Sequence, residues 1–282
     1  MIGIDLDGTL LDNRGQVSRE NLNSIARVQA AGALVVPCTG RAWRESKIPL
    51  AAMPDLSVGV FVTGAAITDI PSGRSLDLSV IEPNLVAEVV DHLYGMPEAV
   101  LVFRESELAD HDYLVTGEGE LTANTLWWFR NCDAKVHHQP HPTADDLHHT
   151  LRIGIVASES RMQQVIGELE GRFGDRLFMH YFQTIGRPQV EGAMFVLEVF
   201  AAGVDKWRGI QWIARQRGID PSRIAVIGDE INDVTMIRNA GCGIAMQNAI
   251  DAVKGVADHV THSHTSDGVA HAINQLLSGA WG

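Results

Sequence analysis

The sequence predicts an α/β protein: a parallel β-sheet with helices on both faces, interrupted by an inserted second α/β domain. The chain has 282 residues, enough for two domains of ordinary size. Short apolar runs alternate with amphipathic helical patterns in its first and last thirds, a rhythm typical of βαβ units. The middle third has strand and helix patterns of its own, which indicates a separate domain between two halves of the sheet.

The first third supplies three expected strands and one expected helix. Apolar runs of strand length occupy residues 2–6, 33–37 and 58–63. Residues 18–31 have helical periodicity, and Ser18 at their start is a favoured N-cap residue. A strand, a helix and a second strand in this order predict parallel neighbours in one sheet.

The last third repeats this alternation. We expect a helix that Asp205 caps at its start and Gly218 ends. The expected strands are residues 194–200, 223–228, 243–246 and 258–261. Together with the first third, these elements predict a Rossmann-like, doubly wound parallel sheet.

The middle of the chain predicts the inserted domain. We expect residues 1–82 and 188–282 to form the core and residues 83–187 to form the insert. An amphipathic helix begins at Asn84. The expected strands of the insert are residues 99–103, 151–157 and 176–182.

The composition excludes several classes of protein. Apolar residues make up 45% of the chain and charged residues 20%, as in soluble globular proteins. A net charge of −13 argues against a nucleic-acid partner. No apolar run approaches the roughly 20 residues of a membrane span, and residues 1–11 do not resemble a signal peptide. Three widely spaced cysteines favour free thiols, so we expect a cytoplasmic protein without a membrane partner.

The first motif is Asp5-Leu6-Asp7-Gly8-Thr9, at the end of the first expected strand. Residues i and i+2 of an extended segment point the same way, so Asp5 and Asp7 can both face the crevice beyond the sheet. Two adjacent carboxylates suit a hard metal ion or an acid–base pair. Asp-Gly is also a common turn signal, which is the alternative reading.

The second acidic motif, Gly228-Asp229-Glu230-Ile231-Asn232-Asp233, also follows an apolar strand. Asp229 falls at the strand end, and Asn232 and Asp233 fall near the start of the next helix, where backbone N–H groups favour an anion. Helix capping by Asp233 explains one acidic residue but not three grouped polar residues.

Two shorter signals accompany these motifs. Thr39 and Gly40 follow an expected strand, and a hydroxyl with a glycine N–H can hold phosphate oxygens, although a plain loop explains them equally well in isolation. Lys206 lies at a helix start, where its charge opposes the helix dipole. Such local conflicts are expected at functional sites.

In this order, the four segments resemble the motifs of the haloacid dehalogenase-like superfamily of phosphotransferases. The resemblance to the Cof-type branch extends to the tail, including the step Asn248-Ala249. It implies a Mg²⁺-dependent phosphatase that hydrolyses a small phosphorylated metabolite, with a sugar phosphate the commonest case. It also implies that the inserted domain is a cap that determines the substrate.

The resemblance implies a role for each motif residue. Asp5 would attack phosphorus and form an aspartyl-phosphate, and Asp7 would act as general acid and then as general base. Mg²⁺ would be held by Asp5, the backbone carbonyl of Asp7, Asp229 and Asp233. The phosphoryl oxygens would be held by Thr39, Gly40, Lys206 and Asn232. We also expect Arg187 to contact a second anionic group of the substrate.

Two departures from the branch stand out. Thr63 occupies a position where the branch often has asparagine, and Trp207-Arg208 follow Lys206 in place of small residues. The motifs leave open a phosphomutase of the same fold, or a non-catalytic regulatory binding module. The expected assembly is a monomer or a homodimer.

Overall fold

The computed structural model describes residues 1–53, 55–183 and 193–281. The chain divides into two compact units. The core unit comprises Met1–Leu78 and Asp205–Gly282, and the inserted unit comprises Ser79–Val204. Within the described ranges, no helix combines the length and apolar character needed to cross a membrane.

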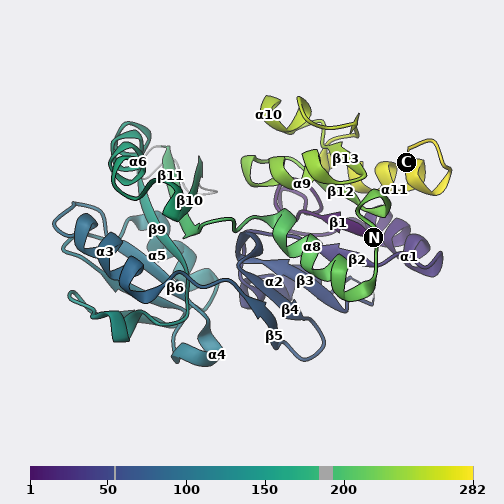
Figure 1. The fold of residues 1–282 in the computed structure, drawn as a ribbon. Coiled ribbons are helices and arrows are strands. Elements are labelled where there is room, and N and C mark those ends of the chain that lie inside the picture. The colour runs from purple at the N-terminus through teal and green to yellow at the C-terminus, as the bar shows by residue number, and fades with distance from the viewer. Residues whose placement is uncertain (54, 184–192, 282) are drawn as a thin grey trace. The chain divides into compact units, whose positions relative to one another are not determined.

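The core unit contains a parallel five-stranded sheet in the order β14-β13-β12-β1-β2 (Figure 1). Its strands are β1 (Ile2–Ile4), β2 (Val35–Pro37), β12 (Ala225–Gly228), β13 (Cys242–Ala245) and β14 (His259–Val260). From β1 the chain adds β2 on one side, whereas the later strands are added on the other side. This reversal creates a switch point between β1 and β12, the place where open α/β sheets bind ligands. The predicted α/β core with a parallel sheet is confirmed.

Helices of the core unit pack in pairs, α1 against α11 and α8 against α9. The helices of the unit are α1 (Arg19–Ala30), α2 (Trp43–Leu50), α8 (Lys206–Arg217), α9 (Val234–Asn239), α10 (Asp251–Lys254) and α11 (Gly268–Leu277). Short 3₁₀ turns are η1 (Val62–Gly64), η4 (Pro221–Arg223), η5 (Ile231–Asp233) and η6 (His264–Ser266). The predicted caps are confirmed: the Ser18 hydroxyl accepts from the Asn21 N–H, and Asp205 accepts from the Arg208 N–H.

Close packing brings α8 onto the middle of the sheet. A Cβ at Gly3 of β1 would lie 3.1 Å from Ile210 Cδ1 of α8 and 3.2 Å from Val226 Cγ1 of β12. Glycine at this position therefore lets the helix that begins with Lys206 approach the central strand closely.

A three-stranded antiparallel sheet extends the core unit beyond β2. It contains β3 (Val58–Phe61), β4 (Ala66–Asp69) and β5 (Ser75–Leu78). A parallel bridge between Cys38 and Val60 places β3 next to the end of β2. The turn η1 therefore follows β3 at the same edge as the segment after β2, which contains Thr39 and Gly40.

The inserted unit contains helices and one mixed six-stranded sheet in the order β10-β11-β9-β6-β7-β8. Its strands are β6 (Val100–Arg104), β7 (Tyr113–Thr116), β8 (Val136–His138), β9 (Thr150–Ser158), β10 (Leu177–Gln183) and β11 (Met194–Ala201). Its helices are α3 (Pro83–Leu93), α4 (Ser106–Ala109), α5 (Ala123–Asn131) and α6 (Glu159–Phe173), with 3₁₀ turns η2 (Ala144–Leu147) and η3 (Gly174–Arg176). The apolar faces of α3 and α6 share one hydrophobic cluster with the sheet.

The assignment of residues 194–200 to the core sheet is wrong. The corresponding strand, β11, pairs with β9 and β10 in the inserted unit. The compact unit accordingly runs to Val204, beyond the expected boundary at residue 187. An apolar run specifies a strand but not its partners, because pairing is decided by tertiary contacts. Glu198 inside the run was the available hint, since buried parallel strands are almost continuously apolar.

Candidate active site

The two acidic motifs meet at the carboxyl ends of β1 and β12. These strands pair in parallel with Ile4 opposite Ile227, and the Asp5 N–H donates to the Ile227 carbonyl at 3.0 Å. Asp5 therefore follows β1 at the same edge where Asp229 follows β12. Because the strand order reverses here, both carboxylates lie at the switch point of the sheet.

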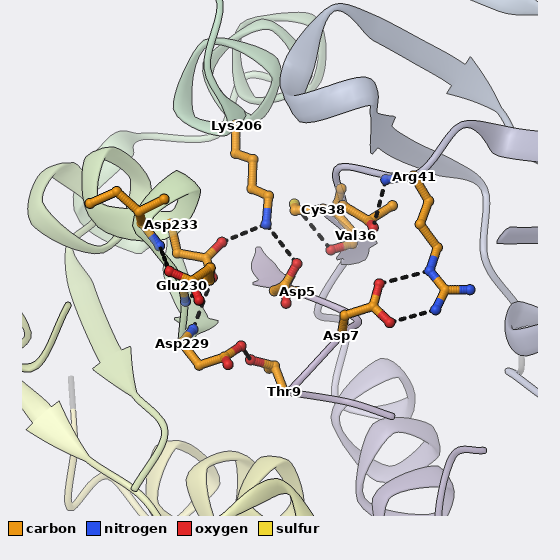
Figure 2. A network of polar contacts seen from close by, with 12 residues as sticks. Asp5, Asp7, Thr9, Val36, Cys38, Arg41, Lys206, Asp229, Glu230 and Asp233 are labelled. Carbon is orange, nitrogen blue, oxygen red and sulfur yellow. Dashed lines mark hydrogen bonds and ion pairs between the residues drawn. The ribbon is translucent and has the colours of Figure 1, made fainter. Parts of the chain in front are cut away.

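Lys206 joins the two motifs through a buried ion-pair network (Figure 2). Its Nζ donates to Asp5 Oδ1 and to Asp233 Oδ1, each at 2.6 Å. The side chains of Lys206, Asp5 and Asp233 are 1%, 6% and 0% exposed. Charged groups this deeply buried are retained only when they are paired. Lys206 at the start of α8, where its charge opposes the helix dipole, therefore points its ammonium group towards two buried carboxylates.

The loop after β12 orients Asp233. Asp233 Oδ2 accepts the backbone N–H groups of Asp229 at 2.8 Å and Glu230 at 3.1 Å, which leaves Oδ1 for Lys206. A Cβ at Gly228 would lie 2.5 Å from Asp233 Cγ, so the side chain needs a glycine there. Asp233 thus both caps the turn and pairs with the lysine, and helix capping alone does not describe it.

The turn after β1 supports Asp229. The Thr9 hydroxyl donates to Asp229 Oδ1 at 2.7 Å. Gly8 has a φ of 75°, and a Cβ there would lie 2.2 Å from Asp229 Oδ2. The Asn248 amide donates to the Gly8 carbonyl at 2.8 Å, which fixes this turn from a third segment of the chain.

Burial of the carboxylates shifts the pKa values of the charged groups in the site. Burial raises the pKa of Asp5 well above its usual range, against the opposing pull of Lys206. Burial and the charge of Asp233 raise the pKa of Asp229 to about 7. Burial alone would lower the pKa of Lys206, but Asp233 and Asp5 together hold it above its usual value. One ammonium therefore does not offset three carboxylates.

These three aspartates are suited to a metal ion. One carboxylate oxygen from each of Asp5, Asp229 and Asp233 lies within 4.8 Å of the other two. An all-oxygen donor set with excess negative charge fits a hard divalent cation. The Asp7 side chain is not part of this cluster, and the ligand expected from Asp7 is its backbone carbonyl.

Asp7 instead forms a bidentate ion pair with Arg41. Arg41 Nε donates to Asp7 Oδ2 at 2.7 Å, and Nη2 donates to Oδ1 at 2.5 Å. Figure 2 shows Asp7 turned towards Arg41 while Asp5 faces Lys206. The pair is partly exposed, with 33% of the Asp7 side chain accessible. Arg41 therefore orients Asp7 in a solvent-accessible part of the site.

The segments that contain Gly40 and Asn232 also meet. Thr39 is buried, and its hydroxyl accepts the Arg41 N–H at 3.1 Å. A Cβ at Gly40 would lie 3.6 Å from Asn232 Nδ2, so the glycine backbone faces the amide. Arg187, expected to bind a second anionic group, lies outside the described residues.

Residues 2–273, nearly the whole chain, match the sequence pattern of one protein family. Its description is haloacid dehalogenase-like hydrolase. The chain belongs to the haloacid dehalogenase-like hydrolases. This membership confirms the resemblance inferred from the four motifs.

Similar proteins of this family include several phosphatases. The chain is 27% identical over 297 residues to 5-amino-6-(5-phospho-D-ribitylamino)uracil phosphatase YwtE of Bacillus subtilis (strain 168), covering 99% of each chain. It is 28% identical to YitU, a phosphatase of the same name from that organism, covering 99% of this chain and 97% of the relative.

Solved structures share the fold. A haloacid dehalogenase-like hydrolase from Bacteroides thetaiotaomicron superposes with a TM-score of 0.76 at 23% identity, covering 98% of both chains. BT4131, described as a HAD subclass IIB sugar phosphatase, also gives 0.76 at 19% identity and 98% coverage of both chains. At these identities the likeness establishes the α/β fold with an inserted domain.

Several residues of this hydrolase site had no expected role in the sequence analysis. Thr9 and Asn248 hold Asp229 and Gly8, and Arg41 holds Asp7. Thr9 lies inside the first motif, Arg41 directly follows Gly40, and Asn248 lies in the tail that resembles the Cof-type branch, so position next to these segments was the available signal. Their partners are determined by turns and by contacts between distant segments, which a linear pattern does not specify.

Proposed function

We propose that the protein is a Mg²⁺-dependent phosphatase that hydrolyses a small phosphomonoester through a phosphorylated Asp5. The main support is the buried Asp5–Lys206–Asp233 network at the switch point of the sheet. It combines a carboxylate nucleophile with a fixed cation beside further acidic groups. Phosphoryl transfer depends mostly on such positioning and charge neutralisation.

In this mechanism, an Asp5 oxygen attacks phosphorus while the bond to the leaving oxygen breaks. Lys206 engages Oδ1, and no hydrogen bond from a described residue reaches Oδ2. The ammonium also attracts the phosphoryl oxygens, which would otherwise be repelled by the carboxylate. Water then attacks the acyl phosphate and regenerates Asp5.

Asp7 is the proposed general acid and base. It gives a proton to the leaving alkoxide in the first step and takes one from the attacking water in the second. The bidentate contact with Arg41 holds its carboxylate in one orientation. Its partial exposure gives it access to both leaving group and water.

Asp5, Asp229, Asp233 and the Asp7 backbone carbonyl are the proposed Mg²⁺ ligands. A bound Mg²⁺ would neutralise charge on the phosphoryl oxygens and keep the buried carboxylates ionised. The raised pKa of Asp5 supports this need, because a protonated carboxyl is a poor nucleophile. Thr9 and the N–H groups that hold Asp233 keep the ligands oriented.

The proposed substrate is a sugar phosphate or a related polyol phosphate. Two relatives are named for a phosphorylated ribitylamino-uracil, and one structural neighbour is described as a sugar phosphatase. We assign the choice of leaving group to the inserted unit, whose sequence is not part of the motifs.

The test measures phosphate release from a panel of hexose phosphates, pentose phosphates and the phosphorylated ribitylamino-uracil, with Mg²⁺ or with EDTA. Release only with Mg²⁺ is expected. Asp5→Asn should abolish turnover with the fold intact, whereas the exposed control Asp251→Asn should remain active. More than a few per cent of residual activity in Asp5→Asn contradicts the nucleophile assignment. Phosphoryl transfer between sugar hydroxyls with little phosphate release would indicate a mutase.

A further inference from the structure

We propose that Asn248 is a positioning residue of the Mg²⁺ site: its side-chain amide ties together the two loops that carry the metal ligands and fixes the carboxylate of Asp229. Asn248 lies outside the four motifs. The inference rests on the proposed function, to which it adds a residue that acts on the metal ion through Asp229.

The Asn248 amide contacts both acidic loops. Its Nδ2 donates to the Gly8 carbonyl at 2.8 Å and to Asp229 Oδ2 at 3.4 Å. Gly8 belongs to the turn after β1, and Asp229 follows β12. A side-chain amide nitrogen carries two N–H groups, so it can serve both acceptors at once. Asn248 therefore bridges the two loops that meet at the switch point of the sheet.

A third contact fixes which way the amide points. Asn248 Oδ1 accepts the backbone N–H of His264 at 3.0 Å. A backbone N–H only donates and a backbone carbonyl only accepts, so the amide oxygen must face His264 and the amide nitrogen must face Gly8. The opposite orientation would place donor against donor and acceptor against acceptor. The Asn248 side chain is therefore held in one orientation by three separate segments of the chain.

The backbone also holds Asn248 beside Asp229. The Met246 N–H donates to the Gly228 carbonyl at 3.0 Å, and the Ile250 N–H donates to the Asp229 carbonyl at 3.1 Å. Asn248 lies midway between these two hydrogen bonds in the sequence. Its amide therefore extends from a backbone that is already attached to the loop it supports.

Asp229 depends on this amide for one of its two oxygens. Oδ1 accepts the Thr9 hydroxyl at 2.7 Å. Among the described residues, Asn248 is the one donor to Oδ2. One hydrogen bond on each oxygen restricts rotation of the carboxylate, and each oxygen keeps a second acceptor site for a metal ion. Groups that orient metal ligands in this way contribute to metal affinity without binding the metal.

Asn248→Ala removes the amide at an exposed position, so the fold should remain intact. The matched control is Asn239→Ala, because Asn239 is an exposed asparagine of the same unit whose amide donates within its own helix, to the Thr235 carbonyl at 2.7 Å. The measurement is the affinity for Mg²⁺ by isothermal titration calorimetry without substrate. A second measurement is the Mg²⁺ concentration that gives half-maximal phosphate release.

We expect Asn248→Ala to weaken Mg²⁺ binding by about 10- to 100-fold. The Mg²⁺ concentration for half-maximal release should rise by the same factor, while kcat at saturating Mg²⁺ should stay within about threefold of wild type. Asn239→Ala should match wild type in both measurements.

Unchanged Mg²⁺ affinity in Asn248→Ala overturns the inference, including the case in which only the Tm in EDTA falls, because that result assigns Asn248 to the fold alone. If Asn248→Ala does not fold, the affinity of Asn248→Ser decides in the same way. Wild type that binds Mg²⁺ but hydrolyses no phosphomonoester contradicts the proposed phosphatase function, while the affinities of the variants still decide the role of Asn248. Wild type without Mg²⁺ affinity overturns both.

Discussion

Replacing Lys206 by methionine should destabilise the core unit and make its stability strongly pH-dependent. The substitution keeps an unbranched side chain of similar length and removes the ammonium that lies 2.6 Å from both Asp5 and Asp233. Two carboxylates then remain in a buried site without their counter-ion. The variant therefore isolates the electrostatic contribution of the lysine from its packing.

The expected loss of stability in Lys206→Met follows from the burial of the ion pairs that it breaks. Removing one partner of a buried, hydrogen-bonded ion pair costs about 3–5 kcal/mol. Domains are stable by about 5–15 kcal/mol, so the loss is a large fraction of the total. Asp5 in the variant should titrate even higher, because the Lys206 charge now opposes the effect of burial on its pKa. The folded variant then takes up protons that the unfolded chain does not, and its stability falls as pH rises above about 4.

The assay is urea unfolding of wild type and Lys206→Met without metal at several pH values between 5 and 8. The difference in unfolding free energy should be about 3–5 kcal/mol at neutral pH and should shrink towards pH 5. The exposed control Lys47→Met should change stability by less than about 0.5 kcal/mol. A loss below about 1 kcal/mol, or a loss independent of pH, would refute the reasoning about a buried counter-ion.

Further predictions concern the other charged groups. Arg41→Gln should reduce kcat by about tenfold or more while costing less than about 1 kcal/mol of stability, because the pair with Asp7 is partly exposed; equal activity in steady-state assays would argue against an orienting role. Mg²⁺ should raise the Tm, with about 2.7 kcal/mol of stabilisation at a hundred times its Kd; Asp229→Asn should weaken this response in thermal-shift titrations. Folding raises the pKa of Asp5 well above its usual range and that of Asp229 to about 7. The stability contributed by these groups is therefore lost in EDTA as pH rises above about 4, and for Asp229 the loss extends through about pH 7. Bound Mg²⁺ should make the unfolding free energy depend less on pH. The same dependence of the unfolding free energy on pH with and without Mg²⁺ would contradict the metal-site proposal.

Much of the site could be predicted because its residues lie next to clear structural signals. Asp5 and Asp229 each follow an apolar strand, and parallel strands bring their carboxyl ends to one edge. Lys206 was marked by a local conflict with the helix dipole, and the structure explains the conflict by two buried carboxylates. The parallel core and the caps at Ser18 and Asp205 follow from periodicity and capping preferences alone.

The remaining features depend on contacts that a linear pattern does not contain. The partner of Asp7 is Arg41, which lies 34 residues further along the chain and reaches Asp7 only in the folded protein. The left-handed conformation of Thr63 runs against the preference of a β-branched residue, so it could not be predicted from the residue type and is seen only in the folded structure. The sheet to which β11 belongs was likewise decided by its pairing with β9 and β10.

Phosphorylation of Asp5 during turnover is the central claim, and mass spectrometry tests it directly. Asp7→Asn removes the proposed general base for hydrolysis and also the general acid for the first step, so the variant is mixed with Mg²⁺ and an aryl phosphate, whose phenolate leaves without taking a proton. The acyl phosphate should then accumulate. After acid quenching and proteolysis, we expect the peptide that contains Asp5 to carry one phosphoryl group on that residue. A phosphoryl group on another residue, or an unmodified Asp5 in a variant that still releases the phenolate, would contradict the mechanism.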